Sequence, residues 1–208
     1  MTTAIIIITV LFSLLCFNNG RLFARFSLRP YYAVHYNQWD RLMTHGFVHG
    51  DFTHLLINML VFWSFGTHIN DYFNWQYEET AGAMDGNLKF ILLYLGGIVV
   101  ASSYDVVKRR DDPNYTSVGA SGAVSAVVFT SIFLNPWGKL YLFGLLPLSG
   151  IVFGALYLLY ESYSTRRKGD RINHHAHILG ALYGFLFPML TDGFGEINTF
   201  IDKLLTRL

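Results

Sequence analysis

Residues 118–134 read VGASGAVSAVVFTSIFL, which joins a polar motif to an apolar helix in a single run. Gly119-Ala120-Ser121-Gly122 opens the run, and apolar residues dominate it as far as Leu134. Glycines on both sides of a serine allow close backbone approach and expose the hydroxyl. At a helix N-terminus, free N–H groups can also receive a developing oxyanion. The same letters fit a small-residue packing face whose serine bonds back to its own helix, so both interpretations stay open.

Five more apolar segments accompany residues 120–134 in this chain of 208 residues: 3–17, 52–65, 90–103, 140–160 and 175–190. Several are shorter than the ~20 residues that a straight helix needs to cross the hydrocarbon core of a bilayer. Together they leave too little polar surface for a soluble protein, since 52% of the residues are hydrophobic and only 14% are charged. We expect a single all-α membrane domain over residues 1–208, a bundle of six transmembrane helices in the lipid bilayer.

The sequence also argues against several classes of protein. Segment 3–17 has no Lys or Arg before it and no evident cleavage site after it, so we expect a retained span rather than a signal peptide. Cys16 is the only cysteine, which excludes an internal disulfide and a multi-cysteine metal site. The basic residues form short clusters between apolar runs, so we expect no nucleic-acid partner.

Two stretches between the apolar segments are polar or mixed. We expect 68–89 to be a loop, because it is the longest polar stretch of the chain. In 20–44, aromatic residues alternate with arginines, which fits a segment lying at the membrane interface. An ordinary long loop with aromatic anchors fits the second stretch equally well.

A second polar cluster, His174-His175-Ala176-His177, opens the sixth apolar segment. Residues 177, 180 and 184 share a helix face, and the glycines Gly180 and Gly184 on it let another helix pack unusually close. A serine–imidazole hydrogen bond between two helices needs such packing, because its heavy atoms must lie about 2.6–3.2 Å apart. A purely structural interhelical histidine is the alternative. His174 and His175 lie about 300° and 200° around the helix from His177, so we expect them to matter less.

A third cluster surrounds the start of the second apolar segment and contains His45, His49, His54 and Asn58. His54 and Asn58 are four residues apart and face one way, so their side chains can complete an oxyanion hole with the Ser121 N–H. For His45 and His49 we favour structural hydrogen bonds. Histidines at such spacing can also bind metal, but the expected chemistry needs no metal or other cofactor.

These three clusters, in this order, resemble the rhomboid family of intramembrane serine proteases. Ser121 matches the family's GxSG serine at the start of the fourth helix, and His177 matches its histidine in an AHxxG context on the sixth. The family's spaced histidines ending in HxxxN match His45, His49, His54 and Asn58, and Trp39-Asp40-Arg41 is a loose counterpart of its Trp-Arg element. The resemblance covers about residues 39–184.

The resemblance implies roles and partners. Ser121 would be the nucleophile and His177 the general base, with no third acidic residue, while His54, Asn58 and the Ser121 amide would form the oxyanion hole. Gly119, Gly122, Gly180, Gly184, His45 and His49 would support them. Substrates would be single-span membrane proteins, cut within or near the span; the oligomeric state is not implied.

Two other functions are weighed against a protease. A catalytically inactive rhomboid-like protein would bind membrane segments, but it would need none of the chemistry of Ser121 and His177. A histidine-lined transporter of metal ions or protons would need carboxylates within the spans, whereas Asp and Glu sit almost entirely in expected loops.

Three features depart from the family pattern or conflict with it. Ser125 stands where many members carry an aromatic residue that packs against the histidine, and Asn70-Asp71 lies near the family's acidic position in the second span. With six spans, eleven of the fifteen Lys and Arg residues fall on the odd-numbered loops, the side from which Ser121 and His177 open. Short basic loops usually stay cytoplasmic, which favours a cytoplasm-facing site, whereas the resemblance favours an exterior or luminal one.

Overall fold

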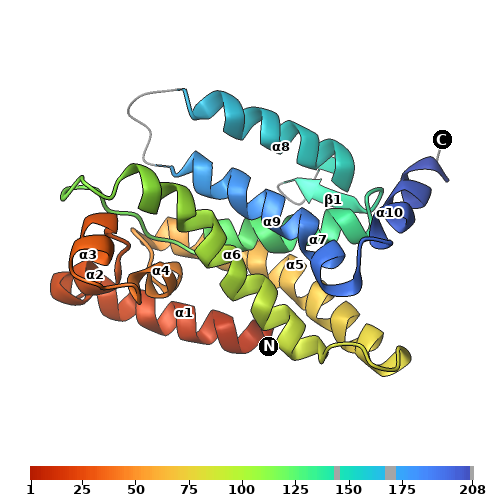
Figure 1. Ribbon diagram of the computed structural model, residues 1–208, viewed down its shortest axis with the longest axis horizontal. Coiled ribbons are helices and arrows are strands. Elements are labelled where there is room, and N and C mark those ends of the chain that lie inside the picture. Colours follow the sequence, from red (N-terminus) through yellow and green to blue (C-terminus); the bar gives the residue numbers. More distant parts are fainter. Residues whose placement is uncertain (143–145, 167–171, 207–208) are drawn as a thin grey trace.

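The computed structural model describes residues 1–142, 146–166 and 172–206, and over these residues the chain is mostly helical. The six principal helices are α1 (Thr2–Phe17), α5 (Phe52–Glu79), α6 (Gly86–Lys108), α7 (Ser121–Leu134), α8 (Gly150–Ser164) and α9 (His174–Asp192) (Figure 1). The shorter elements are α2 (Gly20–Phe26), α3 (Pro30–His35), α4 (Arg41–Thr44), η1 (His45–Phe47), β1 (Lys139–Leu142), β2 (Leu146–Ser149) and α10 (Glu196–Leu205).

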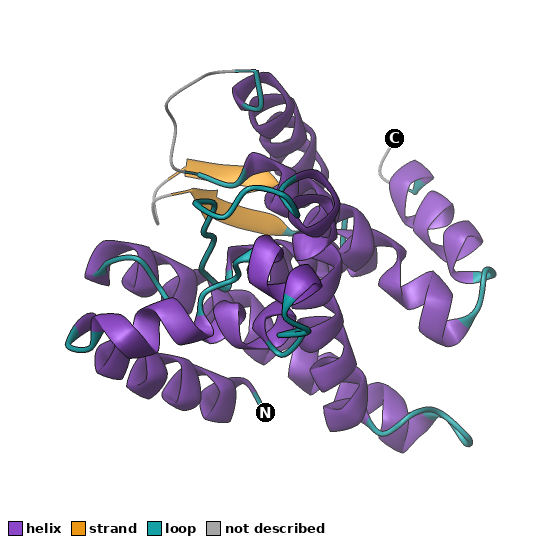
Figure 2. Ribbon diagram, turned by 60° about the vertical axis from the view of Figure 1, so that its left-hand side comes forward, coloured by secondary structure: helices purple, strands orange, loops and turns teal. Residues whose placement is uncertain are grey.

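Helix α7 forms the centre of the bundle, with α5, α6, α8 and α9 packed around it (Figure 1). Figure 2 shows that helices make up most of the fold. Eleven of its fourteen residues are buried, and they are small or apolar. Thr130 donates a hydrogen bond from Oγ1 to the carbonyl oxygen of Gly184 at 2.7 Å, which joins α7 to α9 in the buried interior. The helix that begins at Ser121 is therefore held on every side.

The outer surface of the bundle carries large apolar side chains. Leu11 on α1, Trp63 on α5, Leu159 on α8 and Leu190 on α9 are all more than half exposed. Such a surface is unfavourable in water and suits a lipid environment. Within the described residues, α6 is the one helix both long and apolar enough to cross a bilayer, and α1 and α7 are apolar but shorter. Six spans therefore remain a prediction.

The structure corrects two expected boundaries. Segment 140–160 is not one span, because β1 and β2 pair as an antiparallel hairpin before α8 begins. Pro147 lies in β2, and a proline inside a helix removes a hydrogen bond and clashes with the preceding turn. Stretch 68–89 is not a loop throughout, because α5 continues to Glu79. Ile69 and Phe73, four residues apart, are buried and attach one face of that extension to the core.

Stretch 20–44 folds into short helices that Arg41 ties together. The buried Arg41 guanidinium donates from Nη1 to the carbonyl oxygens of Ala24 and Ser27 at 2.7 and 2.8 Å, and from Nε to Gln38 at 2.7 Å. Four residues of the charge count, Arg167, Lys168, Arg171 and Arg207, lie outside the described residues.

Candidate active site

The backbone just before Ser121 is fixed by the N-terminal part of the chain. The N–H of Gly119 donates to the His45 carbonyl oxygen at 3.0 Å, and the N–H of Ala120 donates to His49 Nε2 at 3.3 Å. Upstream, Leu28 and Ser117 exchange two backbone hydrogen bonds of 2.9 Å. Ser121 is the first residue of α7, so this anchored loop sets the direction of its side chain.

Gly119 is required by both its conformation and its surroundings. Its φ of +120° lies in a region that side chains with a Cβ rarely adopt. A Cβ added here would also lie 2.7 Å from Cε1 of His54. The glycine therefore brings the His54 imidazole against the loop that leads into Ser121.

Helices α7 and α9 pack at the two glycines of the expected face. A Cβ on Gly180 would overlap the carbonyl oxygen of Gly122, and one on Gly184 would overlap that of Ala126. Near the start of both helices, His177 Nε2 lies 2.8 Å from Ser121 Oγ. Two polar motifs 56 residues apart in the chain thus meet at hydrogen-bond distance across this close contact.

The start of α9 is held by residues that the sequence analysis missed. Asn173 caps the helix through Oδ1, which accepts from the N–H of Ala176 at 3.1 Å, and its Nδ2 donates to Asp105 Oδ2 on α6 at 2.5 Å. The same amide lies 3.3 Å from Ser117 Oγ in the loop before Ser121. An Asn one residue before a helix is a recognisable cap, but its contact with Asp105 depends on tertiary packing.

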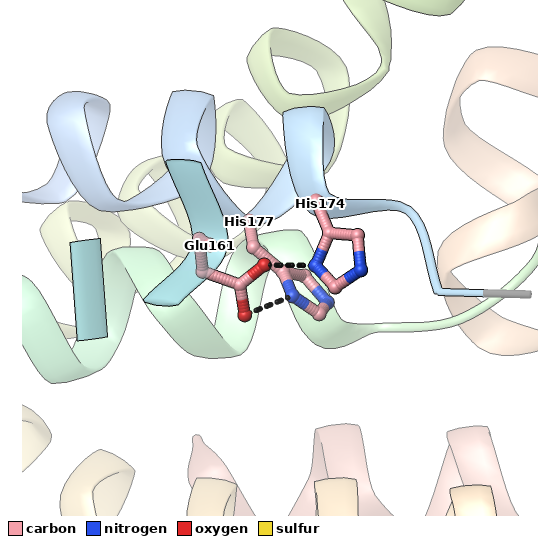
Figure 3. Close-up of side chains that lie close together, drawn as sticks. All are labelled: Glu161, His174 and His177. Atoms are coloured by element: carbon pink, nitrogen blue, oxygen red, sulfur yellow. Dashed lines mark hydrogen bonds and ion pairs between the residues drawn. The ribbon is translucent and has the colours of Figure 1, made fainter. Parts of the chain in front are cut away.

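His177 has an acidic neighbour, Glu161, which the expected serine–histidine pair with no third acidic residue did not include. Glu161 Oε1 on α8 lies 3.0 Å from His177 Nδ1, and its Oε2 lies 2.5 Å from His174 Nδ1 (Figure 3). The carboxylates are also not confined to loops, since Glu161 and Asp105 are buried within helices. His174 faces the same carboxylate as His177, because a rotation of 300° is only 60° short of a full turn.

His175 takes a different direction from its neighbours. Its ring stacks on Tyr104 of α6 with centroids 4.0 Å apart. His175 thus makes a stacking contact, whereas His174 and His177 contact the Glu161 carboxylate.

A cavity of about 1260 Å³ opens beside the serine–histidine pair and is lined by both residues. His54 and Asn58 of α5 and Tyr157 of α8 also line it. Asn58 is buried, and its Nδ2 donates to the His54 carbonyl oxygen at 2.8 Å. The four motif residues thus share one hollow.

His45 and His49 are engaged in hydrogen bonds within the protein. His45 Nδ1 lies 3.0 Å from the Arg41 carbonyl oxygen, while His49 Nδ1 lies 3.0 Å from Ser13 Oγ and its Nε2 meets the Ala120 N–H. Burial lowers the pKa of His45 to about 4 and that of His49 to about 3, so both are neutral near pH 7. Both nitrogens of His49 are therefore occupied without a metal ion.

One group with possible metal-ligand spacing occurs in the described part of the chain. The ligand atoms of Glu161, His174 and His177 all lie within 4.8 Å of one another. The carboxylate contacts both imidazoles directly, at 2.5 Å from His174 Nδ1, which is shorter than an ordinary hydrogen bond, and at 3.0 Å from His177 Nδ1.

The chain is similar to known rhomboid proteins. A family model described as "Rhomboid domain" matches residues 36–192. RHOMBOID-like protein 12, mitochondrial, of Arabidopsis thaliana is 29% identical over 143 residues, which cover 67% of this chain and 43% of that protein. Rhomboid protein 1, mitochondrial, of Saccharomyces cerevisiae is 27% identical over 146 residues, covering 68% of this chain and 38% of that protein. The chain thus spans less than half the length of either relative.

Proposed function

The chain belongs to the rhomboid family, and from that premise we propose that it is an intramembrane serine protease acting through Ser121 and His177. The observation that carries the proposal is the 2.8 Å contact between His177 Nε2 and Ser121 Oγ, made between two different helices. A serine hydroxyl and an imidazole nitrogen at this distance form the pair that nucleophilic catalysis requires.

In the proposed reaction, Ser121 Oγ attacks the carbonyl carbon of the scissile peptide bond while its proton moves to His177 Nε2. The tetrahedral intermediate then collapses, the C–N bond breaks, and the amine leaves with that proton. Water repeats the sequence on the acyl-enzyme and releases Ser121. No metal or cofactor takes part in these steps.

The negative oxygen of the intermediate needs donors, and three candidates surround the cavity. The N–H of Ser121 lies in the first turn of α7, where N–H groups have no partner within the helix. The His54 and Asn58 side chains line the same cavity. We propose that these three groups form the oxyanion hole, with Gly119 leaving room for the His54 ring.

We propose six membrane spans, formed by α1, α5, α6, α7, α8 and α9, and single-span membrane proteins as substrates. The exposed apolar side chains on these helices support the first proposal. The cavity beside Ser121, lined by residues of α5, α7, α8 and α9, supports the second, because an unfolded part of a substrate helix fits a hollow of this size.

The test uses purified protein in detergent and a model single-span substrate. Ser121→Ala and His177→Ala are each expected to abolish cleavage while the protein still folds and inserts into membranes. A fluorophosphonate probe, which reacts with activated serines, is expected to label the wild type but neither variant. Full cleavage by Ser121→Ala would reject the proposal.

An inactive binder of membrane segments is the second candidate function. It predicts that the wild type and Ser121→Ala bind a model membrane segment equally and that neither cuts it. The hydrogen bond between Ser121 and His177 favours the protease, because a binding surface has no use for it.

A further inference from the structure

We propose that Glu161 is a positioning residue for His177, so that the proposed protease acts through a Ser121–His177–Glu161 triad instead of a serine–histidine pair alone. This inference rests on the proposed function and adds a third residue to its site. Glu161 contacts the imidazole and not the serine, so its effect passes through His177.

The geometry is that of a carboxylate held in one orientation. Glu161 is only 4% exposed, and each of its two oxygens faces the Nδ1 atom of a different histidine. Oε2 is occupied by the buried His174, which prevents the carboxylate from rotating away from His177. Figure 3 shows the carboxylate of α8 reaching between the two imidazoles of α9.

The chemical consequence concerns the tautomer of His177. An ionised carboxylate only accepts hydrogen bonds, so Glu161 Oε1 requires the proton on His177 Nδ1. The lone pair then resides on Nε2, which is the atom 2.8 Å from Ser121 Oγ and the one that must take the serine proton. The negative charge also stabilises the imidazolium that forms when the proton arrives.

The position of Glu161 in its helix supports a functional role. Its neighbour Leu159 is 68% exposed on the apolar outer side of α8, whereas Glu161 is buried on the side facing α9. A carboxylate within a membrane helix is costly and by default marks function. The two histidines supply the hydrogen bonds that make its burial tolerable.

The decisive experiment measures the rate at which a fluorophosphonate probe labels Ser121 in detergent-solubilised full-length protein, which needs no knowledge of the natural substrate. Glu161→Gln keeps the size of the side chain and removes its charge, and its amide can donate to Nδ1 and favour the wrong tautomer. The labelling rate and the kcat on a model substrate are expected to fall up to about 10⁴-fold, the loss seen when the triad carboxylate of other serine proteases is changed, with KM nearly unchanged.

Glu161→Asp is expected to recover part of the rate, because it restores the charge with a shorter reach. Glu78→Gln makes the same chemical change at an exposed position of α5 and is expected to label at the wild-type rate. Should Glu161→Gln fail to fold, Glu161→Ala decides, because it removes the carboxylate: a large loss of the labelling rate in folded protein supports the triad, and a wild-type rate overturns it.

Three results would overturn the triad, and they are distinguishable. A wild-type labelling rate in folded Glu161→Gln rejects it and leaves the serine–histidine pair standing. Labelling that stops with EDTA and returns with Zn²⁺ replaces it with a metal site. Wild-type protein whose labelling does not depend on Ser121 and His177 rejects the proposed function itself, and the triad falls with it.

Discussion

The hydroxyl of Tyr157 on α8 lies 2.7 Å from Ser125 Oγ on α7, one helical turn after Ser121. The Tyr157 ring stands 6.3 Å from the His177 ring between centroids, with an angle of 32° between the planes. Ser125 occupies the place where many rhomboid proteins carry an aromatic residue, so an aromatic ring reaches the histidine here from a different helix. Tyr157 also lies one turn before Glu161 on α8, which puts both contacts with His177 on one helix face.

The first prediction concerns the aromatic ring beside His177, which Tyr157 supplies and residue 125 does not. Tyr157→Phe keeps the ring and is expected to lower activity little, whereas Tyr157→Ala is expected to lower it about two- to tenfold, the range of an aromatic contact worth about 0.5–1.5 kcal/mol. Ser125→Phe in the Tyr157→Ala background is expected to recover activity, because the new ring occupies the vacated space. Probe labelling of Ser121 measures all three. No loss in Tyr157→Ala would show that His177 needs no aromatic neighbour.

The second prediction concerns the oxyanion hole. His54→Ala or Asn58→Ala is expected to leave substrate binding largely intact and to lower kcat about 10²–10³-fold, the cost of removing one donor in a well-studied serine protease. Thr67→Ala, an exposed change on the same helix, is the control. Unchanged kcat in both variants would show that His54 and Asn58 are not part of the oxyanion hole.

The third prediction concerns the contact between α7 and α9. Gly180→Val or Gly184→Val is expected to lower both activity and stability, because each new Cβ would overlap a backbone carbonyl oxygen of α7. Overpacking of this kind costs about 1–3 kcal/mol or more, visible as a lower midpoint of thermal unfolding in detergent. Gly20→Val, where a Cβ meets nothing within 4 Å, is the control. Wild-type activity with valine at both positions would show that activity does not require glycine at either position.

The sequence was sufficient for features that depend on local chemistry. A serine between glycines at a helix start and a histidine above two glycines on one face predicted a close interhelical meeting, and the structure has Ser121 and His177 2.8 Å apart. Helical periodicity also placed His54 and Asn58 on the same side of α5, where they line one cavity.

The features that the sequence did not reveal depend on which helices become neighbours. Glu161 sits at the end of an apolar run, and its meeting with His177 follows only once α8 lies beside α9. The hairpin before α8 was missed because an apolar run fits a strand or a buried helix equally well, and Pro147 was the signal that distinguished them.

The fourth prediction concerns acid stability. His45 and His49 titrate in the folded protein at about 4 and about 3, against about 6.5 in an unfolded chain. Between pH 6.5 and 4 the unfolded state therefore binds more protons, so stability falls as the pH is lowered through this window. His49→Gln is expected to reduce that slope by up to about 1.4 kcal/mol per pH unit. Identical slopes in wild type and His49→Gln would contradict the prediction.

The last prediction concerns orientation, on which charge and family resemblance disagree. If the six helices span, both termini lie on one side and the loops that lead into Ser121 and His177 lie on the other. Eleven Lys and Arg residues belong to that other side and four to the side of the termini. Even without the four arginines of the first loop the count is seven to four.

Two of the four terminus-side lysines are also engaged within the protein. The Lys89 ammonium pairs with Asp192 at 2.5 Å, and the Lys203 ammonium donates to the Leu134 carbonyl oxygen at 3.0 Å. On the catalytic side, Arg25, Arg29 and Arg41 are engaged in the same way, so these contacts leave the direction of the bias unchanged. Because short basic loops usually stay on the cytoplasmic side, we expect the active site to open there.

A reporter that works only in the cytoplasm, attached after Leu208, is expected to be silent, and a reporter placed in the Lys108–Arg110 loop is expected to be active. The reverse pattern would place the catalytic opening on the far side, as the family resemblance suggests.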